Sequence, residues 1–533
     1  MGLPTKRRAR ELISGKYLPY EDIQMNKKHS IACALTKQSR RAARQARLEA
    51  HLFQNPLLRH VTAGLSCLFF IGCSVGPSFE APPPPEVTAY TSTPLKTNLD
   101  PQLDLKGQGQ KIIWGKKLQR KWWQGLGCER LNLLVRKVLE QNPTLAAAEA
   151  TLRQANEIYT ARAGSTLYPQ AEASLGSQRQ RINPRALGQT GDAREFDLYN
   201  AGVGVRYTFD PAGGNRSALE ALAAKSDYRR FELEGARLTL EATIVTTAIT
   251  GASLSMQIET MESILRSQTE QLELTQKSVR LGQKSPDAVA ALETQLEQNR
   301  ADLPLVCNQL EQNNHLLAVL TGQAPGAGIQ PSFSLEDFTL PSELPLIVPS
   351  EFVRARPDIS GAEALLKAAN AEYKVAVSNL YPQLNLSADL GSQALTFGSL
   401  FGGGSAVWSL MGQLTQPLFN PGLPAEKRAA LAAFDTASAN YRWVVLEAFR
   451  NMADVLRSLE NDAERLVALS RADKAARLFL DLTQSRYGLG AADYTELLIA
   501  RQQRQQTRLD LIESRAKRLI NSVAFYQAVG GGI

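Results

Sequence analysis

Two stretches of this chain are far too long, as helices, to fit inside a compact domain. Residues 215–281 run for 67 positions without proline, and residues 425–487 run for 63 without proline or glycine. At 1.5 Å per residue, each stretch predicts a helix of roughly 100 Å. Along the second, apolar side chains recur at alternating steps of three and four from Leu431 to Leu469, which is typical of coiled-coil packing. The chain is therefore expected to build long parallel helices rather than a globule.

Each long helix is predicted to turn back on itself at a glycine. Gly282 ends the first stretch and Gly490 follows the second, and glycine is the usual residue where a helix closes in a left-handed conformation. The sequence thus predicts two helical hairpins with tips at 281–287 and 488–499. The returning helices are expected over 286–321 and 492–529. Stacked end to end, the first of these and a helix expected at 144–163 would nearly match the long helix in length.

One structural unit is predicted to occur twice in the chain. The tetrapeptide Leu-Tyr-Pro-Gln stands at 167–170 and again at 380–383. Each copy follows an Ala-rich helical pattern and precedes alternating apolar and polar residues, so its proline marks a helix-to-strand junction. The offset between equivalent positions falls slowly, from 214 residues between Pro143 and Pro357 to 208 between the two tip glycines. Small loop insertions in a duplicated chain produce such a drift.

Four strands are expected, two in each copy, at about 171–181, 200–209, 384–391 and 406–419. Their side chains alternate between apolar and polar with a period of two, which gives each strand one apolar and one polar face. The alternation predicts two sets of residues, a lipid-facing set of Val203, Val205 and Leu386 and a water-facing set of Arg206, Asn385 and Ser387.

Strands of this kind suit the wall of a membrane barrel, with lipid outside and water inside. Four strands cannot close, because membrane barrels begin at about eight strands and an open edge in lipid leaves backbone amides unpaired. Three chains would close a barrel of about twelve strands. The predicted fold class is therefore an internally duplicated α+β membrane protein, a trimeric 12-stranded β-barrel continuous with a long α-helical coiled-coil tunnel.

The basic charge of the chain is concentrated in its leader. Residues 1–60 hold 13 Lys or Arg and 4 Asp or Glu. The rest of the chain holds 47 Lys or Arg and 48 Asp or Glu. A neutral body argues against a nucleic-acid groove. The apolar run at 61–72 is too short to cross a bilayer, which takes about 20 residues, and it fits the hydrophobic region of a secretory signal. It ends at Cys73 in a sequence that resembles a bacterial lipobox, so we predict that Cys73 carries a lipid anchor in the outer membrane.

These boundaries predict the domain organisation. Residues 1–72 form the leader and lipoprotein signal peptide, and residues 73–128 form a lipidated N-terminal linker. Residues 129–349 form the first structural repeat, and residues 350–533 form the second. The cysteines left after Cys73, at positions 128 and 307, give no disulfide framework.

Several short motifs, spread from Cys73 to about Val529, point together to one protein family. They are Cys73–Phe79, Trp122-Trp123, Leu131–Val135, Asn142-Pro143, Arg356–Ile359 with Ala362-Glu363, and Arg486-Tyr487 with Gly490. The chain resembles the TolC-like outer-membrane efflux channels, in their NodT/OprM-like lipoprotein branch. This resemblance implies a homotrimer in the outer membrane of a Gram-negative bacterium, with a tunnel through the periplasm. It also implies a passive exit duct in a tripartite pump, with a periplasmic adaptor (membrane fusion) protein and an inner-membrane transporter of the RND type.

The second hairpin tip departs from this family at its expected gate. Where the family often has a pore-facing aspartate after Leu-Leu, this chain has Ile499. A tunnel that is shut at rest would close at the tips, because small tilts displace helix ends most. The candidate gate residues are Tyr494, Thr495, Glu496 and Ile499, and Gly282 and Gly490 form the turns. Glu496 either replaces the missing acid in the pore or stabilises a helix N-terminus, and the sequence leaves both readings open.

An enzyme and a fibrous adhesin are the two alternatives. Beyond the leader the chain has a single histidine, His315, so a catalytic triad or a histidine metal cluster is hard to assemble. We therefore expect no catalytic residue, no metal site and no cofactor besides the lipid on Cys73. A trimeric coiled-coil surface protein without transport activity would explain the long helices but not the duplicated strand pairs. Nothing in the sequence indicates the exported substrate.

Overall fold

The computed structural model describes residues 75–83, 86–87, 89–99, 109–116, 118–188, 190–327 and 331–532. All of its elements belong to one compact unit, Ser74–Ile533. The leader and the predicted lipidation site Cys73 lie outside the described residues. Within the described part, no helix combines the length and the apolar character that a helix needs to cross a membrane.

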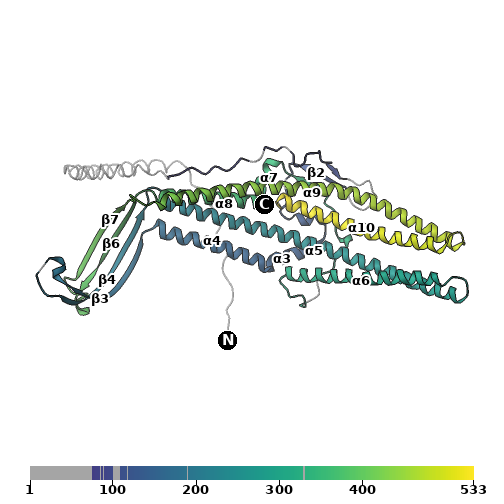
Figure 1. The fold of residues 1–533 in the computed structure, drawn as a ribbon, viewed down its shortest axis with the longest axis horizontal. Coiled ribbons are helices and arrows are strands. Elements are labelled where there is room, and N and C mark those ends of the chain that lie inside the picture. The colour runs from purple at the N-terminus through teal and green to yellow at the C-terminus, as the bar shows by residue number, and fades with distance from the viewer. Residues whose placement is uncertain are drawn as a thin grey trace, which may run out of the picture. The chain divides into compact units, whose positions relative to one another are not determined.

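Two long helical hairpins dominate the structure (Figure 1). The long helices α5 (Gly214–Arg280) and α9 (Gly422–Gly488) each have 67 residues. The helix α6 (Asp287–Leu320) returns along α5, and α10 (Tyr494–Val529) returns along α9. Both hairpins begin and end within a few residues of the predicted positions, so this prediction is confirmed.

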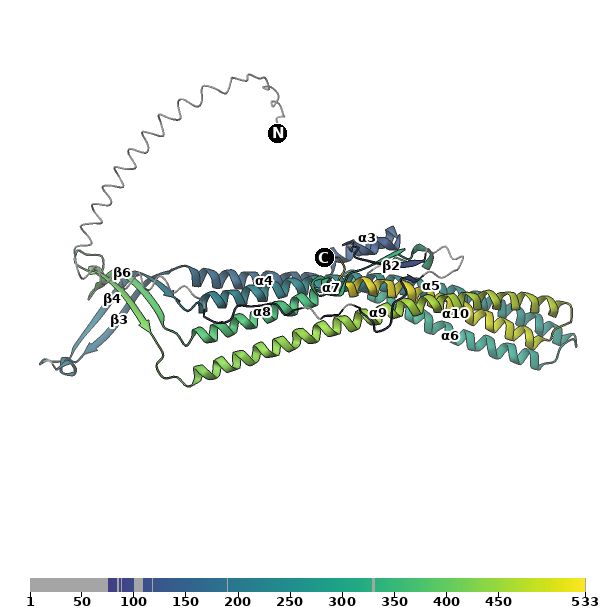
Figure 2. The ribbon, with the colours of Figure 1, turned by 90° about the horizontal axis from the view of Figure 1, so that it is seen from above.

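Two shorter helices complete the helical layer near the strands. They are α4 (Pro143–Leu167) and α8 (Pro357–Ser378). The helix α5 contacts α4 and α8 in its first part and α6 and α10 in its second, whereas α9 contacts α8 and α10 (Figure 2). The element order α4–β3–β4–α5–α6 recurs as α8–β6–β7–α9–α10, which confirms the predicted duplication.

End-to-end junctions join the shorter helices into broken long ones. Asn142 caps the N-terminus of α4, and its side-chain Nδ2 donates a hydrogen bond of 2.9 Å to the carbonyl of Leu320 at the end of α6. In the second repeat, Arg356 before α8 donates a hydrogen bond of 2.8 Å from Nη1 to the carbonyl of Ala528 near the end of α10. The predicted stacking of α4 on α6 is confirmed, and the two motifs Asn142-Pro143 and Arg356-Pro357 have equivalent structural roles.

The heptad pattern of α9 is buried where a neighbouring helix covers it. Near the strands, Leu431 is 43% exposed, so the described chain leaves this end of the seam largely uncovered. Farther along, the predicted seam residues Tyr441, Val445, Ala448, Met452, Leu459 and Leu466 are all buried.

A four-stranded antiparallel sheet lies at one end of the helical layer (Figures 1 and 2). Its order is β3-β4-β6-β7, so the central β4–β6 pair joins the two repeats, and β3 and β7 are the edges. The turns after β3 and β6 contain the 3-10 helices η2 (Pro184–Leu187) and η4 (Phe397–Ser399). The strands are β3 (Gln170–Ile182), β4 (Arg194–Phe209), β6 (Gln383–Ala394) and β7 (Ala406–Thr415).

Several predicted boundaries are wrong. The second strand begins at Arg194 rather than near residue 200, and the third ends at Ala394 rather than near residue 391. The last strand ends at Thr415 rather than Phe419, because Pro417 has no amide hydrogen to donate to a ladder. The helix expected to end near Gly164 continues to Leu167, because one glycine costs a helix only about 1 kcal/mol. The Tyr168-Pro169 pair, not the glycine, stops α4.

A smaller sheet packs beside the middle of the long helices (Figure 1). Its order is β1-β2-β5, and β2 pairs with β5 in parallel although the first repeat lies between them in the sequence. The sequence indicated only an extended linker and an irregular segment here, because such short strands show no alternation. The elements are β1 (Asn98–Leu99), β2 (Gln110–Trp114), β5 (Glu343–Leu346), η1 (Trp122–Leu126), α3 (Glu129–Gln141), η3 (Leu335–Asp337) and α7 (Pro349–Ala355).

A buried arginine of the second hairpin forms hydrogen bonds with this sheet. Arg518 of α10 is only 1% exposed. Its Nη2 donates to the carbonyl of Leu99 at 2.9 Å, and its Nε donates to Gln110 Oε1 at 3.3 Å. Because a buried guanidinium needs acceptors for its N–H groups, these contacts fix where β1 and β2 lie against α10.

Candidate functional site: the strand faces and the hairpin tips

The register of the sheet separates an apolar face from a polar one. Val203 lies opposite Leu390, and Leu390 lies opposite Trp408, so one face is apolar across three strands. On the other face Arg206 lies opposite Ser387, and Arg206 Nη1 donates to Glu172 Oε2 at 3.1 Å. The two predicted sets of residues therefore do lie on opposite faces of the sheet.

Paired glycines let two strands approach closely on the polar face. Gly202 and Gly391 lie opposite each other on β4 and β6. A Cβ atom at Gly391 would lie 2.6 Å from the carbonyl oxygen of Ala201 and 2.9 Å from the Cα of Gly202. The strands approach closely on this side only because no side chain intervenes, and a hollow of about 360 Å³ lies here, lined among others by Asn200 and Asp389. The polar face is thus the concave one.

The apolar face has the height of a membrane barrel. On β4 it runs from Phe209 at the helix end to Tyr199 near the turn. Ten residue steps at about 3.4 Å, tilted by about 40°, rise roughly 26 Å, and the apolar band of membrane barrels is about 25 Å tall. Aromatic side chains mark both limits, since Tyr199 packs edge-on against Phe397 at 5.9 Å and Phe419 is 90% exposed at the helix end. Such girdles are typical of membrane barrels.

Both hairpin tips close with the same backbone motif. Gly282 and Gly490 have φ angles of 68° and 71°, in the left-handed region that favours glycine. In each tip the backbone N–H of the residue after the glycine donates a hydrogen bond to the carbonyl five positions earlier, from Gln283 to Ser278 and from Ala491 to Arg486. This is the Schellman arrangement, and both predicted turn glycines are confirmed.

The carboxylate of Glu496 is paired within its own hairpin. Asp493 caps α10 by accepting a hydrogen bond of 2.7 Å from the backbone N–H of Glu496. The Glu496 side chain lies in the first turn of α10, and its Oε2 is 3.2 Å from Arg486 Nη2. Arg486 also donates to the carbonyl of Ala491 at 3.1 Å. Glu496 is therefore placed as a helix N-terminal acid, with a cation from the preceding helix beside it.

Tyr494 joins the two tips of one chain. Its ring lies 6.0 Å from that of Tyr487, and the ammonium of Lys284 on the first tip stands 4.6 Å from the Tyr494 ring and 5.1 Å from the Tyr487 ring. Such cation–π contacts are attractive. Burial raises the pKa of the Tyr494 phenol. No local pattern pointed to the partner Lys284, because it lies more than 200 residues away in the chain.

The remaining candidate gate residues point away from this contact. Thr495 is exposed, and Ile499 is 54% exposed, while their neighbours Leu497 and Ala500 on the same helix are buried. The four predicted gate residues thus lie within two turns of α10 but have different surroundings. Tyr494 contacts the other hairpin, Glu496 forms an ion pair, and Thr495 and Ile499 are exposed.

Further polar contacts cross between the hairpins above the tips. Asn299 on α6 donates to Gln268 on α5 of its own hairpin at 2.9 Å, and it accepts from Gln505 on α10 of the other hairpin at 3.2 Å. Arg501 on α10 donates to Gln271 on α5 at 3.0 Å. These contacts hold the two hairpins of one chain side by side.

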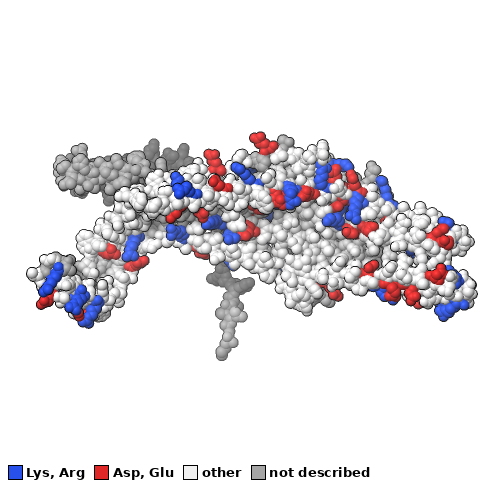
Figure 3. Space-filling view, viewed as in Figure 1, with Lys and Arg blue, Asp and Glu red and all other residues white. Residues whose placement is uncertain are grey.

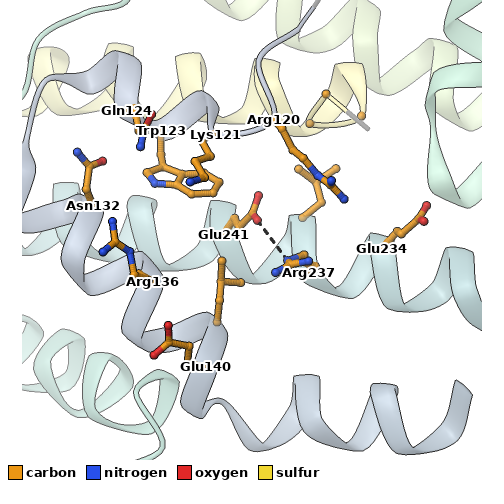
Figure 4. A pocket seen from close by; sticks show the side chains of 15 residues that line it. Arg120, Lys121, Trp123, Gln124, Asn132, Arg136, Glu140, Glu234, Arg237 and Glu241 are labelled. Atoms are coloured by element: carbon orange, nitrogen blue, oxygen red, sulfur yellow. Dashed lines mark ion pairs between the residues drawn. The ribbon is translucent and has the colours of Figure 1, made fainter. Parts of the chain in front are cut away.

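A cleft of about 440 Å³ lies where η1, α3 and α5 meet the C-terminal glycines 530–532 (Figure 4). Figure 4 shows Glu241 near its centre, with Arg237 and Arg120 both on one side of it. Glu241 is 7% exposed, and its Oε1 is 3.8 Å from Arg237 Nε. Burial raises the pKa of Glu241 to about 7, although Arg237, the Trp122 side chain and Arg120 oppose the shift. The sequence offered no sign of this buried acid.

Comparisons with known proteins agree with this geometry. A family model described as outer membrane efflux protein matches residues 134–323 and 348–531. A pyoverdine export outer membrane protein of Pseudomonas aeruginosa is 31% identical over 422 residues, which is 78% of this chain and 87% of that protein. An antibiotic efflux pump outer membrane protein of Pseudomonas putida is 28% identical and covers 86% of this chain and 93% of its own length.

Solved structures show the same fold. The outer-membrane channel OprN superposes with a TM-score of 0.77 at 25% identity, covering 86% of this chain and 99% of its own. The Campylobacter jejuni CmeC outer membrane channel superposes with a TM-score of 0.75 at 20% identity, covering 86% of this chain and 95% of its own. The fold is therefore that of a helical tunnel joined to a β-barrel, and the chain belongs to the outer membrane efflux protein family.

Proposed function

We propose that three copies of this chain form a closed duct that conducts small molecules passively from the periplasm through the outer membrane. The observation that carries the proposal is the sheet, with one apolar face, one polar and concave face, and edges at β3 and β7. Because an open edge is costly in lipid, β7 of one copy would pair with β3 of the next. Three copies give a barrel of about twelve strands, within the known range.

The flanks of the helical layer support the same arrangement. On α4, at one flank, Ile158 is 49% exposed. On α9, at the other, Trp443 and Leu446 are 66% and 65% exposed. Large apolar side chains exposed on both flanks of one layer indicate surfaces that are covered in an assembly. Packing α4 of one copy against α9 of the next would cover both and continue the tunnel wall below the barrel.

The energy for transport would come from partner proteins. A channel of this design conducts passively, and the related proteins named above are pump or export components. We infer a periplasmic adaptor protein and an inner-membrane transporter of the RND type, which together with this chain would make a tripartite pump. The adaptor would contact the hairpin tips, where Leu281 and Leu489 are 72% and 85% exposed.

The N-terminus would add a second attachment to the membrane. The apolar run before Cys73 and the position of that cysteine support a lipid on its thiol. A lipid at the start of the linker would hold the chain at the outer membrane while the barrel assembles. No other cofactor is part of the proposal.

Purified protein tests the proposal directly. In detergent we expect the mass of a trimer, and in planar bilayers we expect discrete conductance steps after reconstitution. A monomer would contradict the shared barrel. A trimer that never conducts would contradict the duct and would instead favour a coiled-coil surface protein.

A further inference from the structure

The sheet carries a charged end on its apolar face. Both strand pairs join the helices at one end, so the turns after β3 and β6 lie at the opposite, distal end (Figure 1). Figure 3 shows blue and red side chains gathered at that distal end. The register places Arg179 opposite Asp197 and Arg181 opposite Glu195. The charged groups there include two exposed arginines on adjacent positions of one strand face.

These arginines lie on the face predicted to meet lipid. Along β3 they follow Ala171, Ala173 and Leu175 at intervals of two residues, so all of them share one side of the sheet. At the same height along β3, Gln178 and Gln180 lie on the polar side of the sheet. Arg179 and Arg181 therefore project outward from the barrel rather than into its lumen.

Their depth matches the headgroup layer. The apolar band ends at Tyr199, which pairs with Ser177. Arg179 stands two residues farther along the strand and Arg181 four, which corresponds to rises of about 5 and 10 Å at a tilt of about 40°. Each headgroup layer is roughly 5–7 Å thick. The first guanidinium thus lies within this layer, and the second reaches back into it along its flexible stem.

The acids opposite leave most guanidinium donors unused. Arg179 Nη2 is 3.6 Å from Glu195 Oε2, and its Nε is 4.0 Å from Asp197 Oδ1. Arg181 Nη1 is 3.5 Å from Glu195 Oε1. The arginine side chains are 73% and 67% exposed. Since each guanidinium has five N–H donors suited to bidentate contact with phosphate, these loose pairs orient the arginines without saturating them.

We propose that Arg179 and Arg181 bind the phosphate groups of an anionic lipid in the outer leaflet of the outer membrane. The proposal rests on the proposed duct, because it requires the barrel to span that membrane. Three copies would place a ring of such sites around the distal rim. Lipid bound there would fix the vertical position of the barrel and stabilise its assembled form.

The test compares two variants of the purified trimer in detergent containing EDTA. The double variant Arg179→Gln, Arg181→Gln removes the proposed site. The control Arg206→Gln removes an arginine of the same sheet from the polar face. The probes are lipid A, which carries two phosphates, phosphatidylethanolamine, and inorganic phosphate. Native mass spectrometry measures binding, and the melting temperature of the trimer measures stabilisation.

We expect lipid A to bind the wild type and the Arg206→Gln variant equally and to raise the melting temperature of both. The double variant should bind lipid A at least about tenfold more weakly, a loss of about 1.4 kcal/mol or more, because it lacks the charge-assisted hydrogen bonds to phosphate. Equal binding by the double variant would overturn the proposal, as would equal stabilisation by inorganic phosphate. Conductance of each variant is recorded in parallel, so that a failed duct is distinguished from a failed lipid site.

Discussion

At the scale of single residues, one buried acid is expected to make the stability of this protein depend on pH. The pKa of Glu241 is raised from an ordinary value of 4.5 to about 7, so the folded state holds its proton more tightly than the unfolded state. The stability that this proton contributes is fully present below pH 4.5 and is lost as the pH rises to about 7. The difference across that window is of the order of 3 kcal/mol.

The variant Glu241→Gln tests this expectation, because glutamine fills the same space without ionising. We expect its melting temperature to exceed that of the wild type at pH 8 and to approach it at pH 4.5. The control Glu140→Gln removes an exposed acid from the rim of the same cleft. It should leave the difference in melting temperature between pH 8 and pH 4.5 as it is in the wild type. A Glu241→Gln protein that keeps the full pH dependence would show that another group is responsible.

At the scale of secondary-structure elements, the strand faces can be tested with a charge. Val205 lies near the middle of the apolar band of β4, so Val205→Arg would place a guanidinium near the bilayer midplane, at a cost of about 2–4 kcal/mol. The matched change Asn385→Arg on the polar face should cost far less. Yields of folded trimer after extraction measure the effect of both variants.

Cysteine labelling tests the same two faces. Ser387→Cys should react with a water-soluble thiol reagent and Val205→Cys should not. The reverse labelling pattern would exchange the two faces.

Elements that repeat or alternate were predictable from the sequence, and contacts between distant segments were not. The hairpins and strands were predicted because heptads, glycine turns and the Tyr-Pro switches are local signals. The strands β1, β2 and β5 were missed because two to five residues show no period. The stacking of α4 on α6 was the exception, because their combined length nearly matches that of α5, whereas the contact of Lys284 with Tyr494 depends on how the two hairpins pack, which no local pattern encodes. For Glu496 the sequence allowed two roles, an acid in the pore or an acid that stabilises a helix N-terminus. Its ion pair with Arg486 favours the second role.

At the scale of the whole molecule, the two proposed membrane attachments should be separable. Cys73→Ser removes the thiol that would carry the lipid and leaves every strand unchanged. We expect it to abolish labelling by a radioactive fatty acid while purified trimers still conduct. Retention in the outer membrane should fall only modestly, because the barrel remains. Labelling that persists in the variant would refute the assignment of Cys73.

The assembled duct must also close, and the contacts at the tips indicate how. Lys284 holds the second tip against the first within one chain through Tyr487 and Tyr494. The exposed Ile499 stands at the position where the family often has an aspartate, so three copies would narrow the pore by apolar contact. Glu496 faces Arg486, which reduces but does not abolish the charge that three copies would present to passing ions. Closure would then depend on packing more than on an acidic ring.

Single-channel recording of tip variants separates these contributions. Tyr494→Ala should raise resting conductance by freeing the second tip, and Ile499→Ala should raise it by widening the constriction. Glu496→Gln should lower cation preference with little change in conductance, whereas Arg486→Gln should raise cation preference by leaving Glu496 unpaired. Gln502→Ala is the control, because Gln502 is exposed on α10, carries no charge and is not among the candidate gate residues. If the tyrosine, isoleucine and glutamate variants all match the wild type in conductance and ion preference, the gate lies elsewhere, and the first tip around Gly282 becomes the better candidate.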